Sequence, residues 1–174
     1  ATDGATVTLY AKWDANEYDI TFHEEGGSTV SDQTVVFDST TNNEVAVPNR
    51  EGYTFNGWFT QQSGGIMVYN ADGTCAKNTA YWDLNGKWIN PDDVILYAQW
   101  TANTYTLTYD TKGGSPLEDQ TVTFDSPYIG ESPERVGYIF DRWFKDTAYT
   151  QPITIGSTLV KTAADHSIYA KWNP

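Results

Sequence analysis

Short stretches in which apolar and polar residues alternate recur along the chain, and they predict β-strands. YTLTY at 105–109 places two tyrosines and a leucine on one face and two threonines on the other. The stretches 18–23, 121–125 and 96–100 alternate in the same way. A period of two with many β-branched and aromatic residues is typical of strands. Helix is expected only at Ser157–Ala164, with its first residue as the cap. The pattern therefore predicts a mainly β fold with little helix, or a small α+β fold.

Several of these phrases occur more than once, which indicates internal repeats. Gly-Tyr, a phenylalanine two residues later and then Trp-Phe occur at Gly52–Phe59 and again at Gly137–Phe144. A third phrase, which ends in tryptophan, occurs three times, at 9–13, 96–100 and 168–172. Each repeat must bury apolar surface of its own, so the repeated aromatic residues are interpreted as core positions.

The repeats divide the chain into three predicted segments. These are the closing strand of a preceding repeat at 1–15, a repeat unit with a long insert (about 60–95) at 16–100, and a shorter repeat unit at 101–174. The chain opens on ATDGATVTLY, so we expect it to be a piece of a longer protein. Without its own unit, the first closing strand is expected to pair with a sheet edge of the first unit or with a neighbouring molecule.

Matching aromatic residues are expected to be buried at equivalent places in the two units. The pairs are Trp58 and Trp143, Trp100 and Trp172, Tyr53 and Tyr138, and Phe55 and Phe140. In each copy, the tryptophan lies three residues after the phenylalanine, which breaks the alternation of a strand. A β-bulge at Asn56-Gly57, and at Asp141-Arg142 in the second copy, would turn the tryptophan back inward.

Composition and charge exclude several classes of protein. Apolar residues make up 39% and aromatic residues 15% of the chain, which favours a globular fold over disorder. The formal net charge of −13 argues against nucleic acids and anionic membranes as partners, because both are polyanions. The single cysteine, Cys75, excludes an internal disulfide. No apolar run reaches the roughly 18 residues that a membrane-spanning helix needs.

Residue types that carry chemistry are few. His23 precedes two glutamates and is interpreted as a solvated strand end, with a metal site or a general base as the alternative. Cys75 has no base that the sequence places beside it, so no catalytic residue is expected. The segment Val68–Thr79 resembles a calcium loop but lacks its first and last carboxylates. A turn at Asp72-Gly73 is favoured there, and no metal and no cofactor are expected.

The insert carries the best hint of ligand binding. Tyr81, Trp82 and Trp88 lie close together in it, and exposed tryptophan faces stack on the apolar face of sugar rings. These three residues are the candidate ligand-binding site. The alternative is that Trp82 and Trp88 pack against each other across two strands of an extra hairpin.

Taken together, the phrases resemble the Listeria–Bacteroides repeat family, also called the internalin B-repeat type. The resemblance rests on GYTFNGWF and GYIFDRWF, the Gly-Gly loops at 26–27 and 113–114, QTVVFD and QTVTFD, and the closing LYAQW and IYAKW. It extends over about residues 16–173, although Arg142 replaces the glycine usual before the tryptophan.

The resemblance implies a β-grasp or ubiquitin-like module in each repeat unit. It also implies tandem arrays in bacterial cell-surface or secreted proteins, acting as stalks, spacers or adhesive segments, with no catalytic residues. Expected partners are neighbouring repeats of the same chain and a host or bacterial surface protein or glycan. A carbohydrate-binding module built on the tryptophans of the insert is the alternative function.

Overall fold

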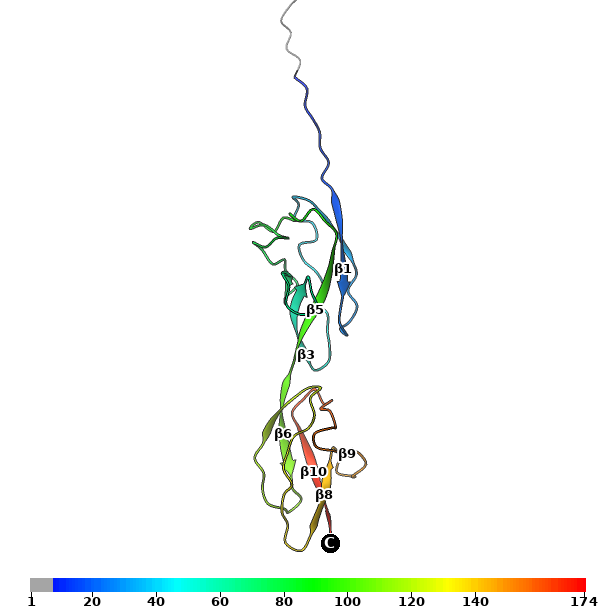
Figure 1. Ribbon diagram of the computed structural model, residues 1–174, viewed down its shortest axis with the longest axis vertical. Helices are drawn as coiled ribbons and strands as arrows, with labels where there is room; N and C mark the ends of the chain where they lie inside the picture. The colour runs from blue at the N-terminus through cyan, green and yellow to red at the C-terminus, as the bar shows by residue number, and fades with distance from the viewer. Residues whose placement is uncertain (1–7) are drawn as a thin grey trace, which may run out of the picture. The chain divides into compact units, whose positions relative to one another are not determined.

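The chain folds into strands, turns and loops. The computed structural model describes residues 8–174, and within that range it contains no helix (Figure 1). The expectation of a mainly β fold with two repeat-like units is confirmed. The helix expected at Ser157–Ala164 was wrong, because this segment forms turns and a bridge between Pro127 and Leu159. The non-helical segment 157–164 places Val160, which is fully buried, in the core of the second sheet.

The first sheet contains five strands in a mixed arrangement. They are β1 (Glu17–His23), β2 (Gln33–Val36), β3 (Tyr53–Phe59), β4 (Met67–Asn70) and β5 (Val94–Ala102). Their order in space is β2-β1-β5-β3-β4. β1 pairs antiparallel with β2 and parallel with β5. The two strands of this sheet that come first and last in the sequence are therefore neighbours within it.

The second sheet repeats this arrangement. It contains β6 (Thr104–Asp110), β7 (Gln120–Thr123), β8 (Ile139–Phe144), β9 (Pro152–Ile153) and β10 (His166–Asn173). Their order is β7-β6-β10-β8-β9, with β6 and β10 parallel. A β-grasp assignment remains a prediction for both sheets.

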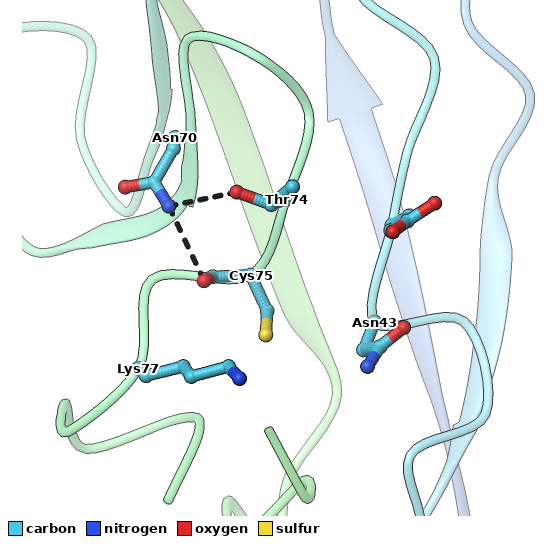
Figure 2. Close-up of a pocket in the computed structure, with 6 residues that line it drawn as sticks. Asn43, Asn70, Thr74, Cys75 and Lys77 are labelled. Atoms are coloured by element: carbon cyan, nitrogen blue, oxygen red, sulfur yellow. Dashed lines mark hydrogen bonds between the residues drawn. The ribbon is translucent and has the colours of Figure 1, made fainter. Parts of the chain in front are cut away.

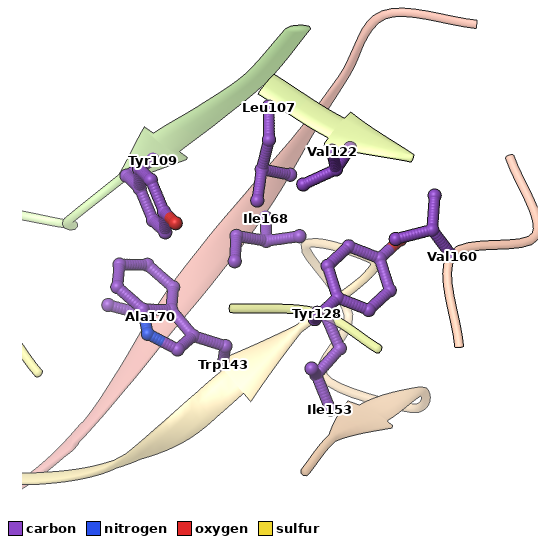
Figure 3. Close-up of a cluster of buried hydrophobic side chains, with 9 residues drawn as sticks. All are labelled: Leu107, Tyr109, Val122, Tyr128, Trp143, Ile153, Val160, Ile168 and Ala170. Carbon is purple, nitrogen blue, oxygen red and sulfur yellow. The ribbon is translucent and has the colours of Figure 1, made fainter. Parts of the chain in front are cut away.

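One face of each sheet carries the core, as the alternation of the strands predicts. In the second sheet, Leu107 on β6, Val122 on β7 and Ile168 on β10 point toward one another and toward Trp143 on β8 (Figure 3). Tyr128, from the loop after β7, lies in the same cluster and is fully buried. In the first sheet, the matching inward positions are also buried: Ile20, Phe22, Val35, Trp58, Leu96 and Ala98.

The expected burial of the repeated aromatics at equivalent places holds for one pair only. Trp58 and Trp143 are both buried, with 0% and 1% of their surfaces exposed, and Phe55 is buried too. The remaining members are not buried, which corrects the expectation: Tyr53, Trp100, Phe140 and Trp172 are half-buried, and Tyr138 is exposed. Tyr53, Trp100, Phe140 and Trp172 lie toward the ends of β3, β5, β8 and β10, and Tyr138 directly precedes β8.

A β-bulge occurs where the spacing of phenylalanine and tryptophan predicted it. In the second sheet, Lys171 of β10 pairs with Arg142 while Trp172 pairs with Phe140, so Asp141 is the extra residue. In the first sheet, Phe55 and Trp58 are both buried although they are three positions apart, and Gly57 has φ 129°. In the second sheet, the extra residue restores the inward direction of Trp143. The bulge expected at Asn56-Gly57 remains a prediction.

Contacts between Cα atoms divide the chain into two compact units. Among the described residues, unit 1 contains 8–25, Thr29–Val47 and Gly57–Gln99; unit 2 contains Gly26–Ser28, Pro48–Asn56 and Trp100–Pro174. The units and the predicted repeats are different divisions of the chain, so the repeat boundaries remain a prediction.

The segment before β1 forms no strand in its described part, 8–15. Leu9, Tyr10 and Trp13 are each 88–89% exposed there. Pairing with a sheet edge of the first unit is therefore not observed, and pairing with a neighbouring molecule remains a prediction. The rest of the predicted closing strand lies outside the described residues.

Candidate functional site

The insert places two candidate residues, Trp82 and Trp88, against each other. They form an antiparallel bridge, and their rings meet edge to face with centroids 5.0 Å apart. Asp83 closes the turn between them, because its Oδ1 accepts hydrogen bonds from the backbone N–H groups of Asn85 and Lys87, both at 2.8 Å. The sequence Asp-Leu-Asn-Gly-Lys thus folds as a local turn that brings the tryptophans together.

Both indoles are fully buried, with 0% of their surfaces exposed. Trp82 also packs against Tyr69 of β4, and Tyr81 is half-buried with its ring 5.7 Å from that of Trp88. Stacking on a sugar requires an exposed ring face, and neither tryptophan presents one in this conformation. The geometry favours the packing alternative. Carbohydrate binding by Tyr81, Trp82 and Trp88 remains a prediction.

A pocket of about 450 Å³ lies beside Cys75 and is lined by polar groups (Figure 2). The Asn70 amide donates to Thr74 Oγ1 at 3.0 Å and to the Cys75 carbonyl at 3.3 Å. The Cys75 N–H donates to the Asn43 carbonyl at 2.8 Å. These hydrogen bonds hold the backbone of the insert in place.

The thiol of Cys75 is not activated as a nucleophile. Burial raises its pKa, against the smaller opposing effect of Lys77. A thiol with a raised pKa is protonated at neutral pH, and the thiolate is the reactive species. Within residues 8–174, no group of three or more His, Cys, Asp or Glu side chains is arranged to hold a metal ion.

The segment with a calcium-loop pattern folds as a turn. Asp72 Oδ1 accepts from the N–H and the hydroxyl of Thr74, at 3.0 and 2.6 Å, and the pKa of Asp72 is lowered by these bonds. Asn70 N–H donates to the Thr74 carbonyl at 2.8 Å, which closes the loop. The turn predicted at Asp72-Gly73 is confirmed.

The two histidines lie in different environments. His23 is exposed at the end of β1, with its ring 5.2 Å from that of Tyr97, as expected for a solvated strand end. His166, for which the sequence suggests no partner, has its Nε2 2.8 Å from the hydroxyl of Tyr128. Its Nδ1 lies 2.8 Å from the Ala164 carbonyl oxygen. Both ring nitrogens of His166 thus have partners that fix the ring at the start of β10.

Sequence reasoning missed an arginine that stacks on a tyrosine three residues later. Arg50 lies over the Tyr53 ring at 3.8 Å, and Arg135 lies over the Tyr138 ring at 3.9 Å. The signal was present as REGY and RVGY. A guanidinium over a tyrosine face gains cation–π attraction, which fixes both side chains in one orientation.

Comparison with known proteins places these features in a family. The family model of the Listeria-Bacteroides repeat domain matches residues 18–80 and 105–171. In the part of the chain that the structure describes, no helix is long and apolar enough to cross a membrane.

Three relatives are similar over much of the chain. Two belong to Evansella cellulosilytica, are named provisionally as a membrane protein and a Gly-rich membrane protein, and are each 29% identical. The matches cover 96% and 95% of this chain but 23% and 18% of those proteins. Internalin H of Listeria monocytogenes is 35% identical over 58% of this chain and 16% of its own length. With the family model matched twice, over more than half of its length, the chain belongs to the Listeria-Bacteroides repeat family.

Proposed function

We propose that the chain is a non-catalytic tandem repeat module of a bacterial cell-surface or secreted protein, and that it acts as a spacer that bears tension. The family and the relative named Internalin H support this assignment. The chain spans less than a quarter of the length of each of the three relatives, consistent with a module of larger proteins. An unactivated thiol and a His166 ring held by two structural contacts favour a role without catalysis.

The observation that carries the spacer function is the parallel pairing of the first and last strands of each sheet. β1 pairs with β5, and β6 pairs with β10. A pull on the chain enters the second sheet at the start of β6 and leaves it at the end of β10. Because these strands are parallel, their pulled ends lie at opposite ends of the ladder.

This geometry makes the force act as shear. All the ladder hydrogen bonds between β6 and β10 are loaded together, instead of breaking one after another. Each is worth only about 0.5–1.5 kcal/mol net, but simultaneous loading adds their resistance. The fully buried Leu107 and Ile168 would also have to slide past each other in the core. A sheet of modest thermodynamic stability can therefore resist force strongly along the chain.

The experiment is single-molecule force spectroscopy of the full chain with two attachment geometries. In a Cys75→Ala background, Thr104→Cys with Asn173→Cys applies shear across β6 and β10. Ile139→Cys with Asn173→Cys pulls on register partners of the antiparallel β8–β10 pair and opens that ladder from its end. All three attachment positions are exposed.

We expect the shear pair to unfold at a clearly higher force than the control pair at the same loading rate. Equal forces in the two geometries would contradict a tension-bearing role. Far-ultraviolet circular dichroism of both labelled proteins provides the check that the attachments leave the fold intact.

A further inference from the structure

Unit 2 contains the same surface turn twice, once covered and once open. The turns are Arg50–Tyr53 and Arg135–Tyr138. In each, the tyrosine N–H donates to the arginine carbonyl at 3.1 Å, and the guanidinium stacks on the tyrosine ring. Each guanidinium also lies near a tryptophan, at a similar distance in the two turns. Arg50 is 5.9 Å from the ring of Trp100, and Arg135 is 6.0 Å from the ring of Trp172.

The first turn is covered by the Phe124-Asp125 pair of the same unit. The Tyr53 hydroxyl donates to Asp125 Oδ2 at 2.7 Å, and this bond raises the pKa of Tyr53. The Phe124 ring meets the Tyr53 ring edge to face, with centroids 5.6 Å apart, and is only 7% exposed. A Cβ on Gly52 would lie 2.4 Å from the Phe124 ring, so glycine is what allows this close approach.

The second turn has no such cover among the described residues. Tyr138 is 42% exposed, Val136 is fully exposed, and nothing lies within 4 Å of a Cβ placed on Gly137. A groove of about 1050 Å³ runs along this surface, and Arg135, Tyr138 and Trp172 contribute to its lining. An open arginine, tyrosine and glycine are thus arranged as in the covered turn.

A second Phe-Asp pair, Phe37-Asp38, matches the one that covers the first turn. Phe37 N–H donates to the Asn16 carbonyl at 2.9 Å, as Phe124 N–H does to the Asn103 carbonyl. The aspartates share the left-handed backbone, with φ 54° at Asp38 and 61° at Asp125. Each aspartate pairs with a lysine, Lys87 and Lys161 respectively.

The Phe37-Asp38 pair differs from its counterpart in exposure. Phe37 is 37% exposed, whereas Phe124 is 7% exposed. The chain therefore presents an uncovered Arg-x-Gly-Tyr turn at Arg135–Tyr138. It also presents a Phe-Asp pair, Phe37-Asp38, that is more exposed than its counterpart and matches it in geometry.

We propose that the turn Arg135–Tyr138 is a docking surface for the Phe37-Asp38 pair of a second copy of this module. The Tyr138 hydroxyl donates to the Asp38 carboxylate, and the Phe37 ring lies over Gly137 and against the Tyr138 ring. The interface is heterologous, because two different surfaces meet, so repeated docking gives open chains or closed rings. In a tandem array the second copy is the next repeat, and the same two surfaces would meet between neighbouring repeats.

This interface is small and needs little affinity when the copies are covalently joined, since a short link supplies an effective concentration in the millimolar range. Separate copies must therefore be measured at concentrations up to about 1 mM. The docking proposal does not depend on the tension-bearing role. That role rests on the ladder between β6 and β10 within one chain, whereas docking rests on two surfaces of separate copies.

The test uses two variants that each remove one surface. Tyr138→Ser removes the ring and hydroxyl of the turn, and Phe37→Ser removes the ring of the pair. Tyr10→Ser is the matched control, because Tyr10 is 88% exposed and belongs to neither surface. Sedimentation equilibrium gives the association constant of each protein, and circular dichroism checks folding.

We expect the wild-type chain and Tyr10→Ser to associate progressively with concentration, and each single variant to associate at least tenfold more weakly. An equimolar mixture of Tyr138→Ser and Phe37→Ser should form one-to-one dimers and nothing larger, because only one intact pair of surfaces remains. Tyr138→Phe, which keeps the ring, should weaken association less than Tyr138→Ser.

Three outcomes would overturn the proposal. They are a wild-type chain that is monomeric at about 1 mM, variants that associate like the wild type, and a mixture of the two variants that fails to form dimers. If Tyr138→Ser is misfolded, Tyr138→Phe replaces it, and an association constant equal to that of the wild type then counts against the hydroxyl contact with Asp38.

Discussion

The rings of Trp82 and Trp88 meet edge to face with centroids 5.0 Å apart, and neither is exposed. Their indole N–H groups are buried without a hydrogen-bond partner, so the pair contributes packing and not polar recognition. Such buried aromatic pairs add about 0.5–1.5 kcal/mol beyond the area that they bury. The insert therefore carries an aromatic cluster of its own.

Removing either tryptophan of the insert should destabilise the protein. Trp82→Ala and Trp88→Ala are each expected to lower the free energy of unfolding by about 3–5 kcal/mol, as for large aromatic residues truncated in a core. Urea denaturation measures this. The opposite result would be a Trp82→Ala variant of unchanged stability that loses binding to a glycan, which would support the carbohydrate-binding alternative.

Trp58 and Trp143 should be energetically equivalent. Both are buried at matching places of the two sheets, so alanine at either position is expected to cost about 3–5 kcal/mol. Trp13→Ala provides a control with the same chemistry, because Trp13 is 88% exposed, and its effect should stay within about 0.5 kcal/mol. Chemical denaturation of the three variants decides, and a small effect at one buried tryptophan alone would refute the equivalence.

Alkaline pH should weaken the fold through its buried tyrosines. Burial is the main cause that raises the pKa of Tyr69, Tyr109 and Tyr128 above the ordinary value of 10.0. A raised pKa means that the folded state keeps the proton longer than the unfolded state. The stabilisation is therefore complete below pH 10 and is lost as the pH rises from there toward the folded pKa values.

Tyr69→Phe tests this account. The variant loses the hydrogen bond from the Tyr69 hydroxyl to the Asn42 carbonyl, worth about 1 kcal/mol at neutral pH. Its unfolding free energy should nevertheless fall less steeply above pH 10 than that of the wild type. Urea denaturation at a series of pH values gives both slopes, and identical slopes would show that Tyr69 does not contribute.

Two glycines with similar backbones should respond differently to alanine. Gly64 and Gly73 have φ of 70° and 85°, which costs an alanine about 1–2 kcal/mol. A Cβ at Gly64 would meet nothing within 4 Å, whereas at Gly73 it would lie 2.2 Å from the Val45 carbonyl oxygen. Gly73→Ala should therefore be clearly more destabilising, and equal losses in thermal unfolding would argue against the close contact.

The alternation of residues was sufficient to predict most strands and their inward faces. Leu107 and Tyr109 on β6, and Ile20 and Phe22 on β1, are buried as the period of two requires, because a strand has only two faces. The bulge at Asp141 followed from the spacing of one phenylalanine and one tryptophan. Membership of the repeat family was also evident from local phrases, since these persist in any copy that builds the same sheet.

Burial at strand ends and inside the insert was decided by tertiary structure alone. Trp172 and Trp143 are the same residue type in strands of one sheet, yet only Trp143 is covered from all sides. Similarly, tryptophans such as Trp82 and Trp88 suit both a sugar platform and a core, and the sequence does not tell which face is covered. The cover of the Arg50–Tyr53 turn by Phe124 and Asp125 required contacts between residues distant along the chain. Local pattern fixes the direction of a side chain, whereas its exposure depends on whatever packs over it.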